Sequence, residues 1–168
     1  MIAPKKTEPL NVLVADDDPI ARDMLQIYLE SIGCRVQAVN DGDTAYQVCE
    51  QRSHELELVV LDARMPGPCP RALYDKLRVI CPSVPILYCS GVSPDDPEMH
   101  FINEHGLSLL PKPFNRTDLL KAMRRVLTAA ESSRSIRGNY GAQRPARQGK
   151  RSAEPASRQE PQEEPQEN

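Results

Sequence analysis

Residues 12–22 of this 168-residue chain are VLVADDDPIAR, an apolar run followed by three consecutive aspartates and a proline. A short apolar run without strict alternation is typical of a strand that is buried on both faces of a parallel sheet. Pro19 favours the first turn of a helix, and Asp18 before it suits the capping position. The stretch therefore predicts a strand, a loop and a helix, with carboxylates at the carboxyl end of the strand.

The same alternation of apolar runs and helical segments extends through about the first 131 residues. This pattern predicts a doubly wound α/β fold, a parallel sheet with helices on both faces. The expected strands are Asn11–Ala15, Arg35–Val39, Glu57–Leu61, Pro85–Cys89 and Leu107–Leu110. The expected helices are Pro19–Ser31, Asp43–Gln51, Pro70–Ile80, Ser93–Glu104 and a last one that Asn115 caps.

Two of these helices have an apolar stripe that predicts their buried face. In the first helix the stripe consists of Ile20, Met24, Leu25, Ile27 and Tyr28. In the last helix it consists of Leu119, Leu120, Met123, Val126 and Leu127. Asp118 stands three residues after Asn115, the spacing at which two side chains cap a helix start reciprocally.

The composition changes after Glu131 and predicts three regions: an extension at 1–9, one folded domain at 10–131 and a disordered tail at 132–168. The tail is nearly free of apolar residues, so burial cannot offset the entropy of ordering it. Its first part, 132–151, has six Lys+Arg and no acid, whereas 152–168 has five Glu and one Arg. A solvated tail and a weak electrostatic docking arm are both compatible with this charge pattern.

Composition also excludes several classes of protein. Residues 1–131 have 14 Lys+Arg against 19 Asp+Glu, a balance that disfavours direct nucleic-acid binding by the domain. An apolar run long enough to cross a membrane is missing, and MIAPKKTEPL lacks the apolar core of a secretory signal. The five cysteines form no CxxC pair and predict no disulfide framework. We therefore expect a cytoplasmic protein without membrane contact.

Polar side chains follow four of the predicted strands at the edge where a parallel sheet binds ligands. They are Asp16 and Asp17 after the first strand, Asp62 after the third, Ser90 after the fourth and Lys112 after the fifth. Clustered carboxylates repel one another unless a cation neutralises them, and Mg²⁺ prefers such oxygen ligands. A carboxylate, a hydroxyl, a lysine and a divalent cation in one pocket indicate phosphoryl transfer, with a carboxylate as nucleophile.

Four stretches together resemble the receiver domain of response regulators. They are VLVADDDPIAR, LVVLDARMPG, PILYCSG and LLPKPF, which fall in the family's order and spacing. The resemblance covers roughly residues 10 to 130 and extends to the receivers of hybrid histidine kinases. It implies a CheY-like, flavodoxin-like fold with five parallel strands in the order 2-1-3-4-5.

The resemblance assigns a role to each polar residue at the predicted edge. Asp62 matches the phospho-acceptor, Ser90 the hydroxyl beside the phosphoryl group and Lys112 its charge partner. The implied Mg²⁺ ligands are Asp16, Asp17, Asp62 and the backbone carbonyl of Arg64. The Lys112-Pro113 peptide is expected to be cis, as in the family. Asp18 is better explained as the cap of the first helix than as a metal ligand.

Two positions depart from the family pattern, and two others bear on how long a phosphoryl group lasts. Pro70 replaces a glycine, which predicts a stiffer loop after the acceptor, and Leu109 replaces the aromatic residue that often moves inward. In receivers, the residues that flank the path of water to the phosphoryl group correspond to Arg64 and Val92. Neither is a general base, so we expect slow hydrolysis, unless Arg64 stabilises the transition state.

The resemblance further implies a stand-alone, non-enzymatic signalling protein. Its phosphodonor would be a histidine kinase or a histidine phosphotransfer protein, and its output a protein target. Two alternatives stay open at this point. One is a haloacid-dehalogenase-like phosphatase, although Asp95 and Asp96 precede Lys112 where that family places its acidic pair later. The other is an interaction module with the receiver fold that does not use phosphate.

Overall fold

A computed structural model describes residues 8–91 and 96–141, without the side chains of Glu98 and of residues 134–141. The five described strands are all parallel and form one sheet in the order β2-β1-β3-β4-β5. They are β1 Asn11–Ala15, β2 Arg35–Val39, β3 Leu58–Asp62, β4 Ile86–Ser90 and β5 Ser108–Pro111. The predicted α/β fold and its strand order are thus confirmed.

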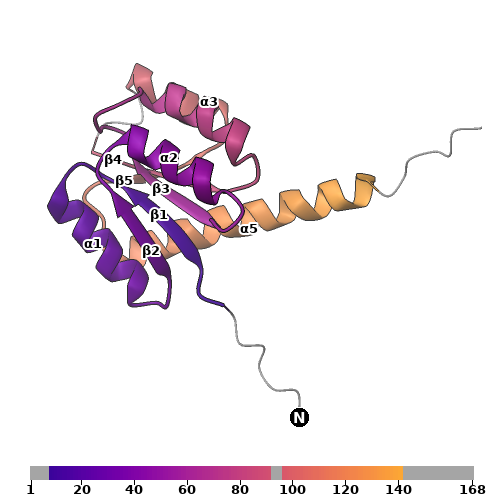
Figure 1. The fold of residues 1–168 in the computed structure, drawn as a ribbon, viewed down its shortest axis with the longest axis horizontal. Coiled ribbons are helices and arrows are strands. Elements are labelled where there is room, and N and C mark those ends of the chain that lie inside the picture. Colours follow the sequence, from indigo (N-terminus) through magenta and orange to yellow (C-terminus); the bar gives the residue numbers. More distant parts are fainter. Residues whose placement is uncertain (1–7, 92–95, 142–168) are drawn as a thin grey trace, which may run out of the picture.

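Helices follow the strands along the chain and lie on both sides of the sheet (Figure 1). They are α1 Pro19–Glu30, α2 Gly42–Arg52, α3 Pro70–Ile80, α4 His100–Glu104, which a 3₁₀ turn at Pro97–Met99 precedes, and α5 Arg116–Gly141. Asp18 caps α1, because its side chain accepts a hydrogen bond from the amide of Ile20 at 2.9 Å. Asn115 and Asp118 exchange two hydrogen bonds at the start of α5, as their spacing predicts.

Successive residues of each strand point to opposite faces of the sheet, which divides the core into two clusters. On one face, Leu13, Val59 and Leu61 pack against α2, α3 and α4. On the other face, Val14 and Val60 pack against α1 and α5. Because helices cover both faces of the sheet, a ligand can reach the sheet only at the ends of its strands.

Three strands lie one residue later than the sequence indicates. The ladder between β3 and β4 continues to the pair Asp62 and Cys89, and the ladder between β4 and β5 continues to Ser90 and Pro111. Asp62 and Ser90 are therefore the last residues of their strands rather than the first residues of the loops. Their backbones are held by the sheet, which fixes the positions of both side chains.

The predicted buried stripe of α1 is partly wrong. Ile20 and Ile27 are 79% and 63% exposed, whereas Leu25 and Leu29 are fully buried against the sheet. Both stripes have helical spacing, and the apolar residues of α1 are too numerous for periodicity to choose between them. In α5 the prediction is better, since Leu119, Met123 and Val126 are buried.

Helix α5 continues past Glu131 to Gly141, which differs from the disorder predicted from residue 132 onward. The hydroxyls of Ser132 and Ser133 donate to the carbonyls four residues earlier, at 3.0 Å and 2.9 Å, and so follow the helical repeat. The helix projects beyond the sheet (Figure 1). Residues 142–168 lie outside the described part of the chain, where the predicted tail stays a prediction.

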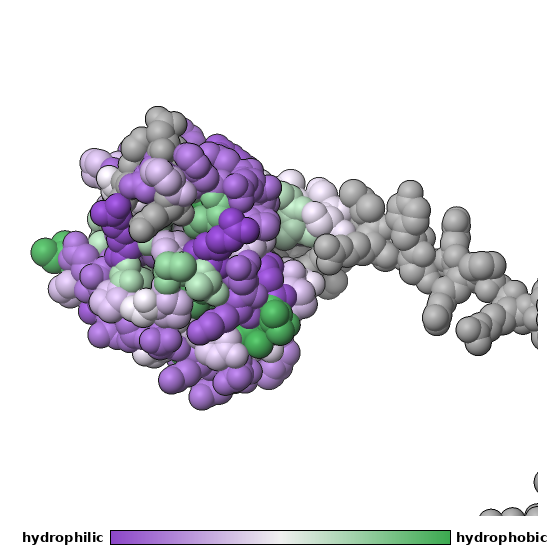
Figure 2. Space-filling model, turned by 90° about the horizontal axis from the view of Figure 1, so that it is seen from above, coloured by the Kyte–Doolittle hydropathy of each residue, from purple (hydrophilic) through white to green (hydrophobic). Residues whose placement is uncertain are grey.

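The surface has few large apolar side chains. Among the described residues the exposed ones are Ile20, Ile27, Ile32 and Val79. Figure 2 shows one face, on which hydrophilic residues predominate and apolar ones occupy separate small areas. Within the described residues, none of the helices is long and apolar enough to cross a membrane.

Candidate functional site

Lys112 joins two buried carboxylates at the carboxyl edge of the sheet. Its Nζ lies 2.7 Å from Oδ2 of Asp16 and 3.3 Å from Oδ2 of Asp62. Asp16 is fully buried after β1, and Asp62 is 8% exposed at the end of β3. Burial weakens the screening of these charges by water, so each ion pair is stronger than on an open surface.

Burial and the neighbouring charges together shift the pKa values of Asp62 and Lys112. Burial raises the pKa of Asp62, the positive charge of Lys112 opposes that rise, and the negative charge of Asp16 adds to it. Burial alone would lower the pKa of Lys112, but its hydrogen bond to Asp16 and the charges of Asp62 and Asp16 outweigh burial and raise it. Lys112 therefore stays protonated, and the site carries an excess of negative charge that would attract a cation.

A third carboxylate completes this acidic cluster. Ligand atoms of Asp16, Asp17 and Asp62 all lie within 4.8 Å of one another. Asp17 is exposed, whereas the other two carboxylates are buried. The amide of Asp18 donates to Oδ1 of Asp16 at 3.1 Å, which holds that carboxylate in place. Three carboxylates at this separation fit a hard divalent cation, since oxygen is the ligand such ions prefer.

Ser90 and Lys112 come to the same edge through neighbouring strands. Ser90 is 1% exposed at the end of β4, beside Asp62 at the end of β3. The amide of Lys112 donates to the carbonyl of Ser90 at 2.7 Å, and the Lys112-Pro113 peptide is cis, as the resemblance implies. All the residues predicted for this edge are thus brought together.

The loop between β3 and α3 borders an open cavity of about 520 Å³ beside the acidic cluster. Asp17 and Arg64 both line it, so it gives access to the cluster from outside. Pro70 is the first residue of α3, where its missing N–H costs nothing because that amide would have no helical partner. The proline that replaces the family's glycine therefore begins a helix rather than only stiffening the loop.

Arg64 makes an ion pair that the sequence did not predict. One guanidinium nitrogen lies 3.2 Å from Oδ2 of Asp96, and the backbone amide of Arg64 donates to Oδ1 of Asp62 at 3.4 Å. Arg64 and Asp96 belong to different loops, and spacing along the chain contains no signal for such a pair. Val92, the second residue predicted to flank the acceptor, lies outside the described residues.

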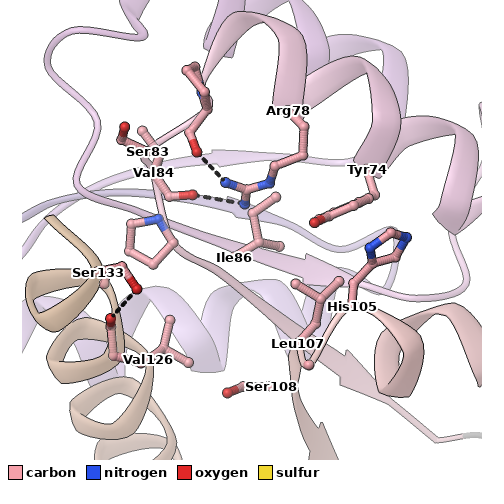
Figure 3. Close-up of a pocket in the computed structure, with 15 residues that line it drawn as sticks. Tyr74, Arg78, Ser83, Val84, Ile86, His105, Leu107, Ser108, Val126 and Ser133 are labelled. Carbon is pink, nitrogen blue, oxygen red and sulfur yellow. Dashed lines mark hydrogen bonds between the residues drawn. The ribbon is translucent and has the colours of Figure 1, made fainter. Parts of the chain in front are cut away.

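A separate cavity of about 380 Å³ is lined by residues at the amino ends of β4 and β5, among them Ile86 and Ser108 (Figure 3). The carboxylates of the acidic cluster do not line it. Arg78 lines it, and its guanidinium donates to the carbonyls of Pro82 at 3.1 Å and Val84 at 2.9 Å. The same group lies 5.2 Å from the centre of the Tyr74 ring. Arg78 thus holds the turn between α3 and β4, which is a structural role.

Comparison with known proteins agrees with this geometry. The family model "Response regulator receiver domain" matches residues 12–124. The chain is 26% identical over 120 residues to the "Probable transcriptional regulatory protein TcrX" of Mycobacterium tuberculosis, covering 71% of this chain and 50% of TcrX. It is 29% identical over 116 residues to the "Autoinducer 1 sensor kinase/phosphatase LuxN" of Vibrio campbellii, covering 69% of this chain and 13% of LuxN.

Solved structures share the fold. The receiver domain of the sensor histidine kinase PA1611 from Pseudomonas aeruginosa, whose structure has a magnesium ion coordinated in the active site cleft, aligns with a TM-score of 0.64 and 23% identity. That alignment covers 71% of this chain and 98% of the PA1611 domain. The chain spans half the length of TcrX and a smaller part of LuxN. Since the family model matches more than half of the chain, this protein belongs to the response regulator receiver family and contains a receiver domain of two-component signalling.

Proposed function

We propose that the protein accepts a phosphoryl group on Asp62 and signals through contacts with other proteins. The observation that carries this proposal is the position of Asp62, which ends β3 with Lys112 3.3 Å from its carboxylate and two further carboxylates beside it. The site opens to the cavity that Asp17 and Arg64 line, so a donor can approach it. The phosphodonor would be a histidine kinase or a histidine phosphotransfer protein.

In the proposed reaction one carboxylate oxygen of Asp62 attacks the phosphorus of a phosphohistidine. The bond between phosphorus and the imidazole nitrogen breaks, a bond between phosphorus and the Asp62 oxygen forms, and the imidazole keeps the electron pair and takes up a proton. Lys112 stays protonated and balances the charge on the phosphoryl oxygens. Ser90, at the neighbouring strand end, would donate its hydroxyl proton to one of them.

The residues that would hold Mg²⁺ are Asp16, Asp17, Asp62 and the backbone carbonyl of Arg64. Their fit rests on the three carboxylates whose ligand atoms lie within 4.8 Å of one another. When bound, the ion would neutralise charge on the transferring group and orient its oxygens. Asp16 would also keep its hydrogen bond to Lys112, so the lysine and the metal ligands form one connected set.

The match to the receiver family bears on one of the two alternatives that the sequence leaves open. The chain matches the receiver domain model, which disfavours the haloacid-dehalogenase-like phosphatase. We propose that the chain itself is not an enzyme. Labelling with acetyl phosphate distinguishes the proposed function from the phosphate-independent module. A cytoplasmic location and the absence of direct nucleic-acid binding by the domain remain predictions from the sequence.

The proposal is tested by incubating the full chain with acetyl phosphate and Mg²⁺ and measuring its intact mass. We expect one added phosphoryl group in the wild type and none in Asp62→Asn, because the amide cannot serve as the nucleophile. Asp43→Asn, which replaces an exposed aspartate of α2, is the matched control and should be labelled like the wild type. An unlabelled wild type would favour the phosphate-independent module.

A further inference from the structure

The ion pair between Arg64 and Asp96 connects the acceptor to a part of the chain that the proposed chemistry does not use. Arg64 stands two residues after Asp62, and Asp96 precedes the 3₁₀ turn Pro97–Met99 that leads into α4. The distance between the paired side-chain atoms is 3.2 Å, and the two side chains are 61% and 23% exposed. The Arg64 side chain thus extends from the loop between β3 and α3, the acceptor loop, to the segment that begins α4.

Asp96 also fixes the start of that segment through its backbone. Its carbonyl accepts a hydrogen bond from the amide of Met99 at 2.8 Å, which closes the 3₁₀ turn. Met99, Phe101 and Ile102 after it are buried against the sheet. A displacement of Asp96 would therefore loosen the turn and change how the short helix α4 packs.

Arg64 is placed to change partners when Asp62 is modified. Its amide already donates to Oδ1 of Asp62 at 3.4 Å, while Oδ2 of Asp62 faces Lys112 at 3.3 Å. The cavity that Arg64 shares with Asp17 leaves room for its side chain to turn toward the acceptor. The Arg64 side chain is 61% exposed, so neighbouring side chains do not enclose its guanidinium.

The charges decide which anion Arg64 prefers. The pair with Asp96 is partly exposed, and ion pairs of that kind contribute little stability. A phosphoryl group carries about −1.5 to −2 charges and three acceptor oxygens, against a single charge on a carboxylate. Its oxygens also match the fork of donors on a guanidinium. A phosphoryl group on Asp62 should therefore outcompete Asp96.

We propose that Asp96 is a positioning residue for Arg64, and that phosphorylation of Asp62 transfers the Arg64 guanidinium from Asp96 to the phosphoryl group and so releases the turn before α4. This inference rests on the proposed function, because it requires a phosphoryl group on Asp62. It gives the chain a response in the α4 region although Leu109 replaces the aromatic residue that often moves in receivers.

The test is amide hydrogen exchange of the full chain, followed in peptides that cover residues 97–104, with and without beryllofluoride and Mg²⁺. Beryllofluoride stands in for the phosphoryl group on a carboxylate. Its binding to Asp62 is checked separately, because bound beryllofluoride should block labelling of the chain by acetyl phosphate. In the wild type we expect beryllofluoride to raise exchange in this stretch several-fold. In Asp96→Asn and in Arg64→Gln, exchange should already be raised, and beryllofluoride should add nothing further.

Arg71→Gln is the matched control. Arg71 pairs with Glu104 at 3.1 Å, so this variant also removes an ion pair to α4, but one that does not involve the acceptor loop. It should keep the response to beryllofluoride. If beryllofluoride occupies the wild type and exchange is unchanged, or if Asp96→Asn still responds, the transfer of Arg64 is wrong and the proposed function stands. If acetyl phosphate does not label Asp62, both proposals fail.

Discussion

Asp62 makes the folded protein less stable when it is ionised, because its charge lies in a poorly hydrated place. Burial raises the pKa of Asp62 despite the opposing charge of Lys112. For a carboxyl group with a raised pKa, the cost to stability is absent below the unfolded value of 3.8 and complete above the folded pKa. The acceptor thus makes the apo domain less stable in the neutral range.

This cost predicts the behaviour of Asp62→Asn in metal-free buffer. At neutral pH the variant should melt a few degrees above the wild type, because it removes the buried charge and keeps the shape. The difference should vanish below pH 3.8, where both side chains are neutral. Mg²⁺ should stabilise the wild type more than the variant. Thermal melts in EDTA and in Mg²⁺ measure this, and a variant that melts lower at neutral pH contradicts it.

The start of α2 illustrates how single residues define an element. The carboxylate of Asp41 accepts hydrogen bonds from the amide and the hydroxyl of Thr44, both at 2.7 Å. These two bonds lower the pKa of Asp41, the amide having the larger effect. For a carboxyl group with a lowered pKa, the stabilisation is present above the unfolded value of 3.8 and is lost as pH falls through the folded pKa.

Asp41→Ala should therefore cost about 1 kcal/mol of the free energy of unfolding at neutral pH, a typical value for the loss of a cap. The cost should shrink as pH falls below 3.8, because the protonated wild-type side chain then caps less well. Urea unfolding at neutral and acidic pH gives the comparison. Asp43→Asn, in the first turn of the same helix, is the control. If the loss of unfolding free energy does not depend on pH, it comes from lost packing and not from the hydrogen bonds of the ionised Asp41.

Sequence patterns predicted the existence of the helices and strands well. They predicted the buried side of a helix less well. Pro70–Ile80 was predicted with its observed bounds, because a proline marks its start and a Cys-Pro pair follows its end. The face of α1 was partly wrong, since apolar residues surround much of that helix and only contact with the sheet selects Leu25 and Leu29. Local signals mark the ends of helices, whereas their buried face depends on the tertiary structure.

At the scale of the whole molecule, the site could be predicted because its residues share a topological rule. Asp16, Asp62 and Ser90 all end or follow parallel strands, and such ends meet at one edge of a sheet. The pair of Arg64 with Asp96 follows no such rule. It joins two loops whose relative positions are set only when the sheet has formed.

The stability of the domain should not depend on the residues that follow the buried part of α5. Val126 is the last α5 side chain among the described residues that is buried. The far end of α5 projects beyond the sheet (Figure 1). A chain that ends after Ser133 should therefore melt within a few degrees of the full chain. It should also be labelled by acetyl phosphate to the same extent. Loss of folding in this variant would show that the later residues pack on the domain.

The position of the phosphoryl group on the chain can be measured directly, and we expect it on Asp62. Borohydride reduces an aspartyl phosphate to homoserine, which peptide mass spectrometry locates after treatment with acetyl phosphate and Mg²⁺. We predict homoserine at position 62 and at no other aspartate. Homoserine at Asp16 or Asp17, or unmodified Asp62 in a protein that has gained a phosphoryl group, would contradict the account.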